Sequence, residues 1–199
     1  MNPFRHLLLS LFSAIILVFY LTVPLQAEHS FSREYRLKVG LIFNLAQFVV
    51  FPEPCGPRAP GRFTVGILGA DPFGEEIDIL TGKCIQDKPI QIKRYHTIDD
   101  VQDCHMLFIG ASEKTGIKWI IDRLKAKSIL TISDMEGFAE YGGMINMVTV
   151  NNRIRFKVNL SRVKTAGLKI SAHFLKLATI IDQQQPQGDT GTIYENIAP

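Results

Sequence analysis

Histidine and serine, the side chains that most often serve in acid–base and nucleophilic catalysis, form no known catalytic or metal-binding pattern in this sequence. The histidines include no H-E-x-x-H motif and no pair at i, i+4 that would ligate a metal ion. No serine lies in a G-x-S-x-G elbow. We therefore expect no catalytic residue, no metal site and no cofactor. The histidines beyond residue 27 are His29, His96, His105 and His173, of which His105 is interpreted as a hydrogen-bonded structural residue within a strand.

Three glycines, Gly66, Gly69 and Gly74, lie in and after a predicted strand that leads into a helix. A connection of this kind binds an anion when its backbone N–H groups are free. The segment lacks the Gly-Lys-Ser/Thr of a P-loop and the spacing of a dinucleotide fingerprint. A tight turn is therefore the favoured interpretation, and anion binding is the alternative.

The N-terminal residues have the pattern of a secretory signal peptide. Arg5 precedes an apolar run from Leu7 to Val23, and the small residue Ala27 stands at the predicted cleavage site. The run has 17 positions, near the lower limit for a membrane span, so an uncleaved anchor is the alternative. We expect residues 1–27 to be removed near Ala27, residues 28–182 to form one domain in the periplasm, and residues 183–199 to be a flexible polar tail.

The three cysteines contain no C-x-x-C pair, which argues against a zinc site or a thioredoxin-type motif. In an oxidising compartment we expect a disulfide between Cys84 and Cys104, because each lies beside a predicted strand. That bridge would close a 21-residue loop and stabilise the domain by about 3 kcal/mol. Cys55 lies in a proline-rich segment and is expected to be an exposed, unpaired thiol. The alternative is that no disulfide forms.

The composition is that of a globular domain. Hydrophobic residues make up 46% and charged residues 21% of the 199 residues. The formal net charge is +3, and Lys and Arg are spread along the chain. The sequence therefore indicates no binding of nucleic acid.

Apolar periodicity predicts alternating helices and strands. The stretch from Arg33 to Phe51 has helical spacing and stops before Pro52. Strands separated by helices imply an α/β fold with a mainly parallel sheet and helices on both of its faces. A C-terminal antiparallel hairpin turns at Asn151-Asn152. The predicted strands are 63–69, 89–95, 104–109 and 128–133, with the hairpin at 144–150 and 153–158, and further helices are predicted at 71–79, 97–102, 113–125, 161–166 and 172–182.

The segment between the last two predicted helices is a candidate binding surface. Leu168 and Ile170 alternate around Lys169 in a stretch too short to form its own core, and Phe174 follows one turn into the next helix. If exposed, these side chains form an apolar patch with a basic rim, suited to a protein partner or a second copy of the chain. The alternative is that they are buried beneath the helices.

Three blocks of sequence carry a family pattern. The first runs from Glu34-Tyr35 to Phe51-Pro52 and is similar to Y-x-x-K-A-A-F-L-Y-N-F-A-K-F-V-x-W-P. The second is 65–74 followed by 104–109, and the third comprises 137–145, 155–160 and 167–171. Together, over about residues 34–181, the blocks resemble the YfiR family of periplasmic proteins. Phe51 stands where the family usually has Trp, and Gly40 where it commonly has Ala.

The resemblance implies a binding function without enzymatic activity. Characterised members of the family repress an inner-membrane diguanylate cyclase by holding its periplasmic domain, and an outer-membrane lipoprotein sequesters the repressor. For this chain the resemblance implies such a cyclase or another sensor protein as partner, with cyclic di-GMP output and biofilm growth downstream. A homodimer is a further expected arrangement. The alternative function is a periplasmic solute-binding module with a pocket at the carboxyl ends of the parallel strands.

Overall fold

The structure is a computed structural model that describes residues 24–52 and 61–181, with side chains from Arg33 onward. The predicted signal peptide up to residue 23, Cys55 and the predicted polar tail lie outside the described residues. The last four residues of the predicted signal peptide, 24–27, form the first turn of helix α2 (Pro24–Gln47).

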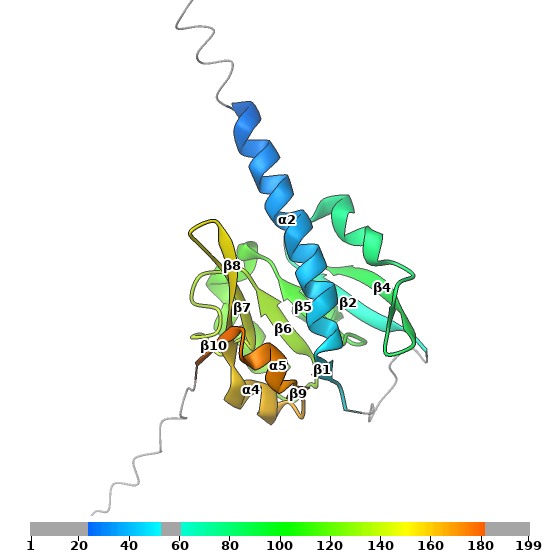
Figure 1. Cartoon of the computed structure of the whole chain (residues 1–199). Coiled ribbons are helices and arrows are strands. Elements are labelled where there is room, and N and C mark those ends of the chain that lie inside the picture. Colours follow the sequence, from blue (N-terminus) through cyan, green and yellow to red (C-terminus); the bar gives the residue numbers. More distant parts are fainter. Residues whose placement is uncertain (1–23, 53–60, 182–199) are drawn as a thin grey trace, which may run out of the picture.

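An eight-stranded, mainly parallel sheet forms the centre of the domain (Figure 1), which confirms the predicted α/β fold. Its central strands β2, β5 and β6 are buried along their whole length, as expected for strands covered on both faces. In spatial order the strands are β10 (Ala178–Ile181), β8 (Arg153–Asn159), β7 (Ile145–Val150), β6 (Leu130–Ser133), β5 (Met106–Ile109), β2 (Phe63–Leu68), β4 (Lys88–Tyr95) and β3 (Cys84–Ile85).

Parallel pairing joins β4, β2, β5, β6 and β7 in series. The predicted hairpin is present, since β8 returns antiparallel to β7. Its turn residues Asn151 and Asn152 have φ values of 49° and 58°, a left-handed conformation that asparagine tolerates. At the two margins β10 lies parallel to β8, and β3 lies antiparallel to β4.

Two predicted helices end earlier than expected, because the residues at their C-terminal ends pair as β-strands instead. Helix α2 ends at Gln47, and β1 (Val49–Val50) then pairs antiparallel with β9 (Lys169–Ile170) in a second, two-stranded sheet. The predicted helix over 172–182 is wrong beyond its first turn. Only α5 (Ala172–Leu175) is helical, and the residues that follow it form β10 beside β8.

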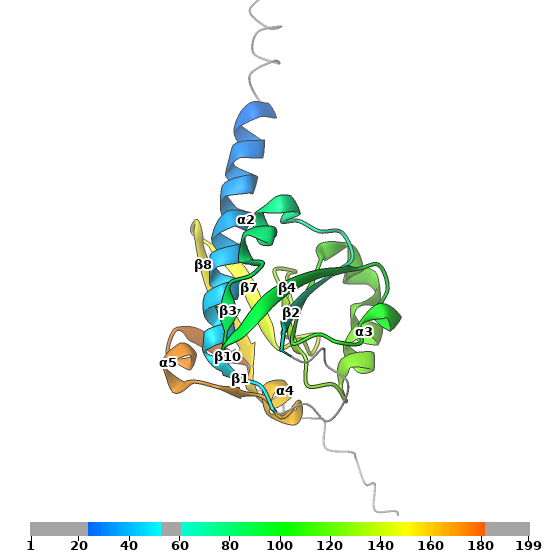
Figure 2. The same ribbon diagram turned by 90° about the vertical axis from the view of Figure 1, so that its right-hand side faces the viewer.

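Helices cover both faces of the sheet (Figure 2). Helix α2 packs on one face through an apolar stripe that includes Val39, Ile42 and Leu45. Helix α3 (Ile117–Leu124) lies on the opposite face and buries its own apolar stripe there. The remaining short helices are η1 (Gly74–Leu80), η2 (Ile98–Asp100), η3 (Ala111–Gly116) and α4 (Leu160–Thr165).

Candidate functional site

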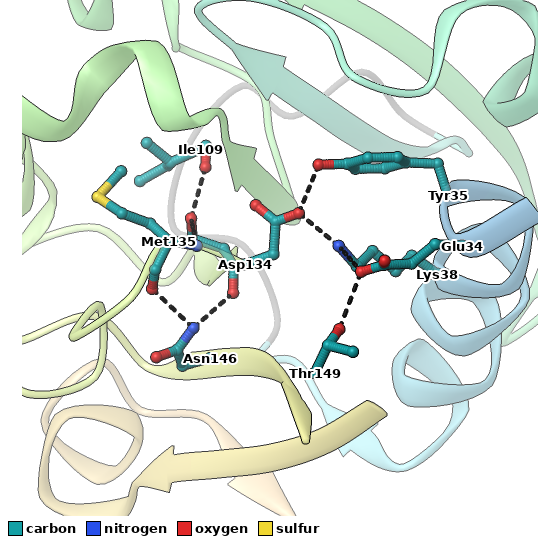
Figure 3. A network of polar contacts seen from close by, with 9 residues as sticks. Glu34, Tyr35, Lys38, Ile109, Asp134, Met135, Asn146 and Thr149 are labelled. Carbon is teal, nitrogen blue, oxygen red and sulfur yellow. Dashed lines mark hydrogen bonds and ion pairs between the residues drawn. The ribbon is translucent and has the colours of Figure 1, made fainter. Parts of the chain in front are cut away.

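Charged side chains of α2 meet the carboxyl end of β6 (Figure 3). Asp134 follows directly after β6, and its Oδ2 lies 2.6 Å from Nζ of Lys38. The same Nζ lies 2.8 Å from Oε1 of Glu34, and the Tyr35 hydroxyl donates a 2.8 Å hydrogen bond to Oδ2 of Asp134. The Thr149 hydroxyl, on β7, donates to Glu34 at 2.9 Å. We call these five residues the α2–β6 network.

Helical spacing brings the three α2 residues of the network together. Glu34 and Lys38 are four positions apart and Tyr35 and Lys38 three, so they lie on one face of the helix. The Lys38 Nζ also lies 4.2 Å from the centroid of the Tyr35 ring, which adds a cation–π contact. The network therefore joins the first helix to β6 and β7 through residues that are far apart in the sequence.

Burial makes the charges of the network dependent on one another. The Lys38 side chain is 4% exposed and that of Asp134 is 11% exposed. A hydrogen bond from Lys38 lowers the pKa of Glu34, although partial burial opposes this shift. Burial raises the pKa of Tyr35, and its bond to Asp134 raises it further, so the phenol remains protonated and donates. These mutually satisfied groups suit a structural clamp better than acid–base catalysis.

Buried hydrogen bonds hold the chain in place where it leaves β6 (Figure 3). The Asn146 side-chain N–H₂ donates to the carbonyl oxygens of Ser133 and Met135, at 3.1 and 2.9 Å. The Ser133 hydroxyl donates to the carbonyl oxygen of Ile109 at 2.7 Å. These bonds fix the backbone position from which Asp134 reaches Lys38.

The α2–β6 network was not predicted from the sequence, although the sequence contains one signal for it. Lys38 lies four residues before Ile42 and seven before Leu45, which places a charged residue on the buried stripe of the helix. A charge at such a position indicates a partner of opposite sign in the core. The identity of that partner, Asp134, depends on tertiary structure.

The connection from β2 to η1 forms a tight turn, which was the favoured interpretation of its glycines. Oδ1 of Asp71 accepts hydrogen bonds from the backbone N–H groups of Phe73 and Gly74, at 2.7 and 3.3 Å. Oδ2 of Asp71 accepts from Arg94 at 2.7 Å. The amide groups that an anion would need therefore bind a carboxylate of the protein itself.

The connections at the carboxyl ends of β2 and β5 pack directly against each other. The Ala70 N–H donates to the Ser112 hydroxyl at 2.9 Å. A Cβ at Gly110 would lie 2.5 Å from the carbonyl oxygen of Ala70, so only glycine fits there. These contacts and the α2–β6 network occupy the carboxyl ends of β2, β5 and β6, which are three of the strand ends at which the solute-binding alternative placed its pocket.

The predicted Cys84–Cys104 disulfide is wrong, because the two residues are not bonded to each other in the structure. Cys84 is exposed on the marginal strand β3, whereas Cys104 is buried just before β5. Strands β4 and β2 lie between these positions in the sheet. The Cys104 thiol instead donates to the carbonyl oxygen of Met106 at 2.8 Å. The prediction failed because the position of each cysteine next to a strand in the sequence does not show which strands are neighbours in the sheet.

The predicted partner-binding residues lie mainly in the core. Leu168 is 2% and Phe174 is 4% exposed, which confirms the buried alternative for these two side chains. Ile170 is half-buried and is paired with Val49, and Lys169 is exposed. An exposed apolar patch is therefore not formed here. Contact of a partner with Lys169 and Ile170 stays a prediction.

His105 has the structural role that we predicted. It is buried, its Nδ1 accepts a hydrogen bond from the Thr64 N–H at 3.1 Å, and its ring stacks on Phe63 with centroids 4.7 Å apart. Among residues 24–52 and 61–181, no three His, Cys, Asp or Glu side chains are grouped so that they could hold a metal ion. No helix within the same residues combines the length and the apolar character needed to cross a bilayer.

Comparison with known proteins places the domain in a family. No curated protein sequence matches the chain. The model of the YfiR/HmsC-like family matches residues 35–179, which run from the middle of α2 into β10. This family comprises periplasmic regulators of cyclic di-GMP signalling and is regulatory, not catalytic. Because the match extends over most of the chain, the protein belongs to the YfiR/HmsC-like family.

Proposed function

We propose that this chain represses an inner-membrane diguanylate cyclase by binding the periplasmic domain of that enzyme. The observation that carries the proposal is the family match over residues 35–179, which covers almost all of the described sheet and helices. In this proposal residues 1–27 direct export and are removed near Ala27. An outer-membrane lipoprotein would relieve the repression by sequestering the protein.

The chemistry of the interior supports binding over catalysis. Lys38 and Asp134 are the buried charged pair of the α2–β6 network, and each already has its partner within the protein. Groups that are satisfied in this way have no unused capacity to transfer a proton to a substrate. The buried charged groups therefore stabilise the domain, and the residues that bind a partner would lie on its surface.

The surface carries side chains of the kinds that dominate protein interfaces. Trp119 on α3 is 56% exposed, and the guanidinium of Arg123 lies 5.7 Å from the centroid of its ring. Tryptophan and arginine are the residue types most enriched among energetically dominant interface positions. Exposed aromatic and aliphatic side chains on a rigid domain support a role as a binding protein.

The proposal is tested in cells of the host by deletion and re-expression of the full chain. Deletion should raise cyclic di-GMP, measured by mass spectrometry, and should increase biofilm mass; re-expression should reverse both effects. The matched control is the chain without residues 2–27, which would not be exported and should leave cyclic di-GMP at the deletion level. The chain is also crosslinked to its neighbours in the periplasm, and the linked proteins are identified by mass spectrometry. Unchanged cyclic di-GMP after deletion, together with no diguanylate cyclase among the linked proteins, would reject the proposal.

Export is tested separately on the mature protein. Mass spectrometry should find an N-terminus at or near Glu28 in the periplasmic fraction. An intact Met1 in the membrane fraction would show that the segment is retained as an anchor, and the proposed soluble periplasmic form would then be wrong.

A further inference from the structure

Positive and negative charges are distributed differently along this chain. Lys and Arg occur throughout, but residues 141–181 contain seven of them and no Asp or Glu. Residues 63–140 contain thirteen acidic and nine basic residues. Three of these seven basic residues, Arg153, Arg155 and Lys157, lie on strand β8 near one margin of the sheet, and the other four follow β8 in the chain.

Strand β8 separates its basic and apolar side chains onto two faces. Arg153 and Arg155 are exposed on the face of the sheet turned away from α2. Lys157, next on that face, is half-buried and pairs with Glu140 at 2.6 Å. The alternate positions of β8 are apolar and pack in the core on the α2 side, and they are Ile154, Phe156 and Val158.

The neighbouring strand adds apolar side chains to the same basic face. Val148 is directly opposite Arg155, and Val150 is directly opposite Arg153, so each valine shares a face with an arginine. Val150 is 50% exposed. We call Val148, Val150, Arg153 and Arg155 the hairpin face. Figure 1 shows this hairpin, in yellow, at the margin of the domain.

The arginines of the hairpin face differ in their pairing from other arginines of the domain. Arg36, Arg94 and Arg123 each form an ion pair with a carboxylate. Within the described residues, no carboxylate forms an ion pair with Arg153 or Arg155. Two exposed guanidinium groups beside the exposed Val150 and the half-buried Val148, in a segment without acidic residues, form a surface complementary to carboxylates.

We propose that the hairpin face docks an acidic patch of the partner protein, with partner carboxylates pairing with Arg153 and Arg155 around Val150. This inference rests on the proposed function, because it names the surface by which the regulator would hold its partner. Guanidinium groups bind carboxylates in bidentate geometry, which fixes orientation as well as adding affinity. The valines favour a protein surface over a phosphate backbone or a lipid headgroup layer, since an apolar contact excludes water around the ion pairs.

The test compares two charge-reversed variants of the full chain. Arg153→Glu/Arg155→Glu changes the hairpin face, and Lys164→Glu/Lys176→Glu makes the same change in net charge at exposed positions elsewhere in the acid-free segment. Binding to the purified periplasmic domain of the cyclase is measured by titration, and thermal unfolding shows that both variants fold. We expect the hairpin variant to bind about tenfold or more weakly and to lose repression in cells, while the control variant keeps both.

The outcomes separate this inference from the proposed function. If the wild-type chain binds the cyclase domain and the hairpin variant binds it equally well, the hairpin face is not the docking site, and the proposed function stands. If the wild-type chain does not bind the cyclase domain, the proposed function fails and the inference fails with it. If the wild-type chain binds vesicles of phosphatidylglycerol, and the hairpin variant loses that binding while still binding the cyclase, the face serves a membrane and the inference is overturned.

Discussion

Lys38 and Asp134 are 96 residues apart in the sequence, yet their charged atoms lie 2.6 Å apart in the interior of the domain. Lys38 belongs to the first helix, and Asp134 directly follows β6, a strand near the middle of the sheet. The pair therefore fastens α2 to the sheet at a position where neither charge has more than slight contact with water. The stability of this helix on the sheet should depend on both residues together.

Replacement of Lys38 by methionine should strongly destabilise the domain. The change leaves the Asp134 carboxylate buried without its ammonium partner, which costs about 3–5 kcal/mol in unfolding free energy. Urea denaturation of Lys38→Met measures the loss. The double variant Lys38→Met/Asp134→Leu should recover part of it, because both charges are then absent. Lys118→Met, at an exposed position of α3, is the control and should change stability by less than about 0.5 kcal/mol. Wild-type stability of Lys38→Met would contradict the clamp.

The Glu34–Lys38 contact should make stability depend on pH in the acidic range. The pKa of Glu34 is lowered in the folded state by its hydrogen bond from Lys38. A carboxyl group with a lowered folded pKa adds stability above its unfolded pKa and loses it as the pH falls through the folded value. Glu34→Gln should therefore be less stable than wild type at pH 7, and the difference should shrink as the pH falls below the ordinary glutamate pKa of about 4.3.

Chemical denaturation at several pH values measures this difference. Glu75→Gln, at an exposed position of η1, serves as the control and should show a small difference at every pH. A gap between Glu34→Gln and wild type that persists undiminished at about pH 3, well below the ordinary pKa of glutamate, would show that the Glu34 charge does not contribute.

The two described cysteines should differ in their reactivity. Cys84 is exposed and Cys104 is buried, so N-ethylmaleimide should label Cys84 in the folded protein and Cys104 only after unfolding. Cys84→Ser should leave the melting temperature unchanged under non-reducing conditions. Peptide mapping without reductant checks the pairing directly. Recovery of a linked Cys84–Cys104 peptide from the native protein would contradict the structure.

Phe174 should contribute to stability as a core residue. Its ring stacks on Phe48 and packs against Phe156, with centroid distances of 6.0 and 5.0 Å. Phe174→Ala should cost about 3–5 kcal/mol, measured by chemical denaturation. Lys169→Ala, at the nearby exposed position, is the control and should be almost neutral. A Phe174→Ala protein that unfolds like wild type would argue that this segment is not part of the core.

Ile170→Asp tests the short two-stranded sheet. Ile170 is paired with Val49 and packs against the core, so a carboxylate at this position should be costly to bury and should lower the melting temperature markedly. A melting temperature equal to that of wild type would show that β9 tolerates charge and lies at the surface. Loss of repression by such a stable variant would then assign Ile170 to partner binding.

The sequence by itself determined the elements that are specified by local patterns, namely the buried strands and the β7–β8 hairpin. The apolar runs of β2, β5 and β6 predicted buried parallel strands, and the alternation of β8 with Asn151-Asn152 predicted the hairpin. At the start of α4 the Asn159 side chain accepts a hydrogen bond from the Arg162 N–H, a capping contact between residues three positions apart. These features are readable from the sequence because periodicity, turn conformation and capping involve residues within a few positions of one another.

Tertiary structure alone decided the features that depend on a distant partner. The residues of β10 were predicted to be helical, but β8 offers them a free row of backbone hydrogen-bonding groups, and this pairing outweighs their local preference. Cys84 and Cys104 are apart because of the strand order: Cys84 lies on β3 and Cys104 lies just before β5, and strands β4 and β2 lie between them in the sheet. Lys38 was readable as a charge on a buried stripe, but its partner Asp134 was not. Contacts between residues far apart in the sequence arise only when the sheet is assembled, so no local pattern encodes them.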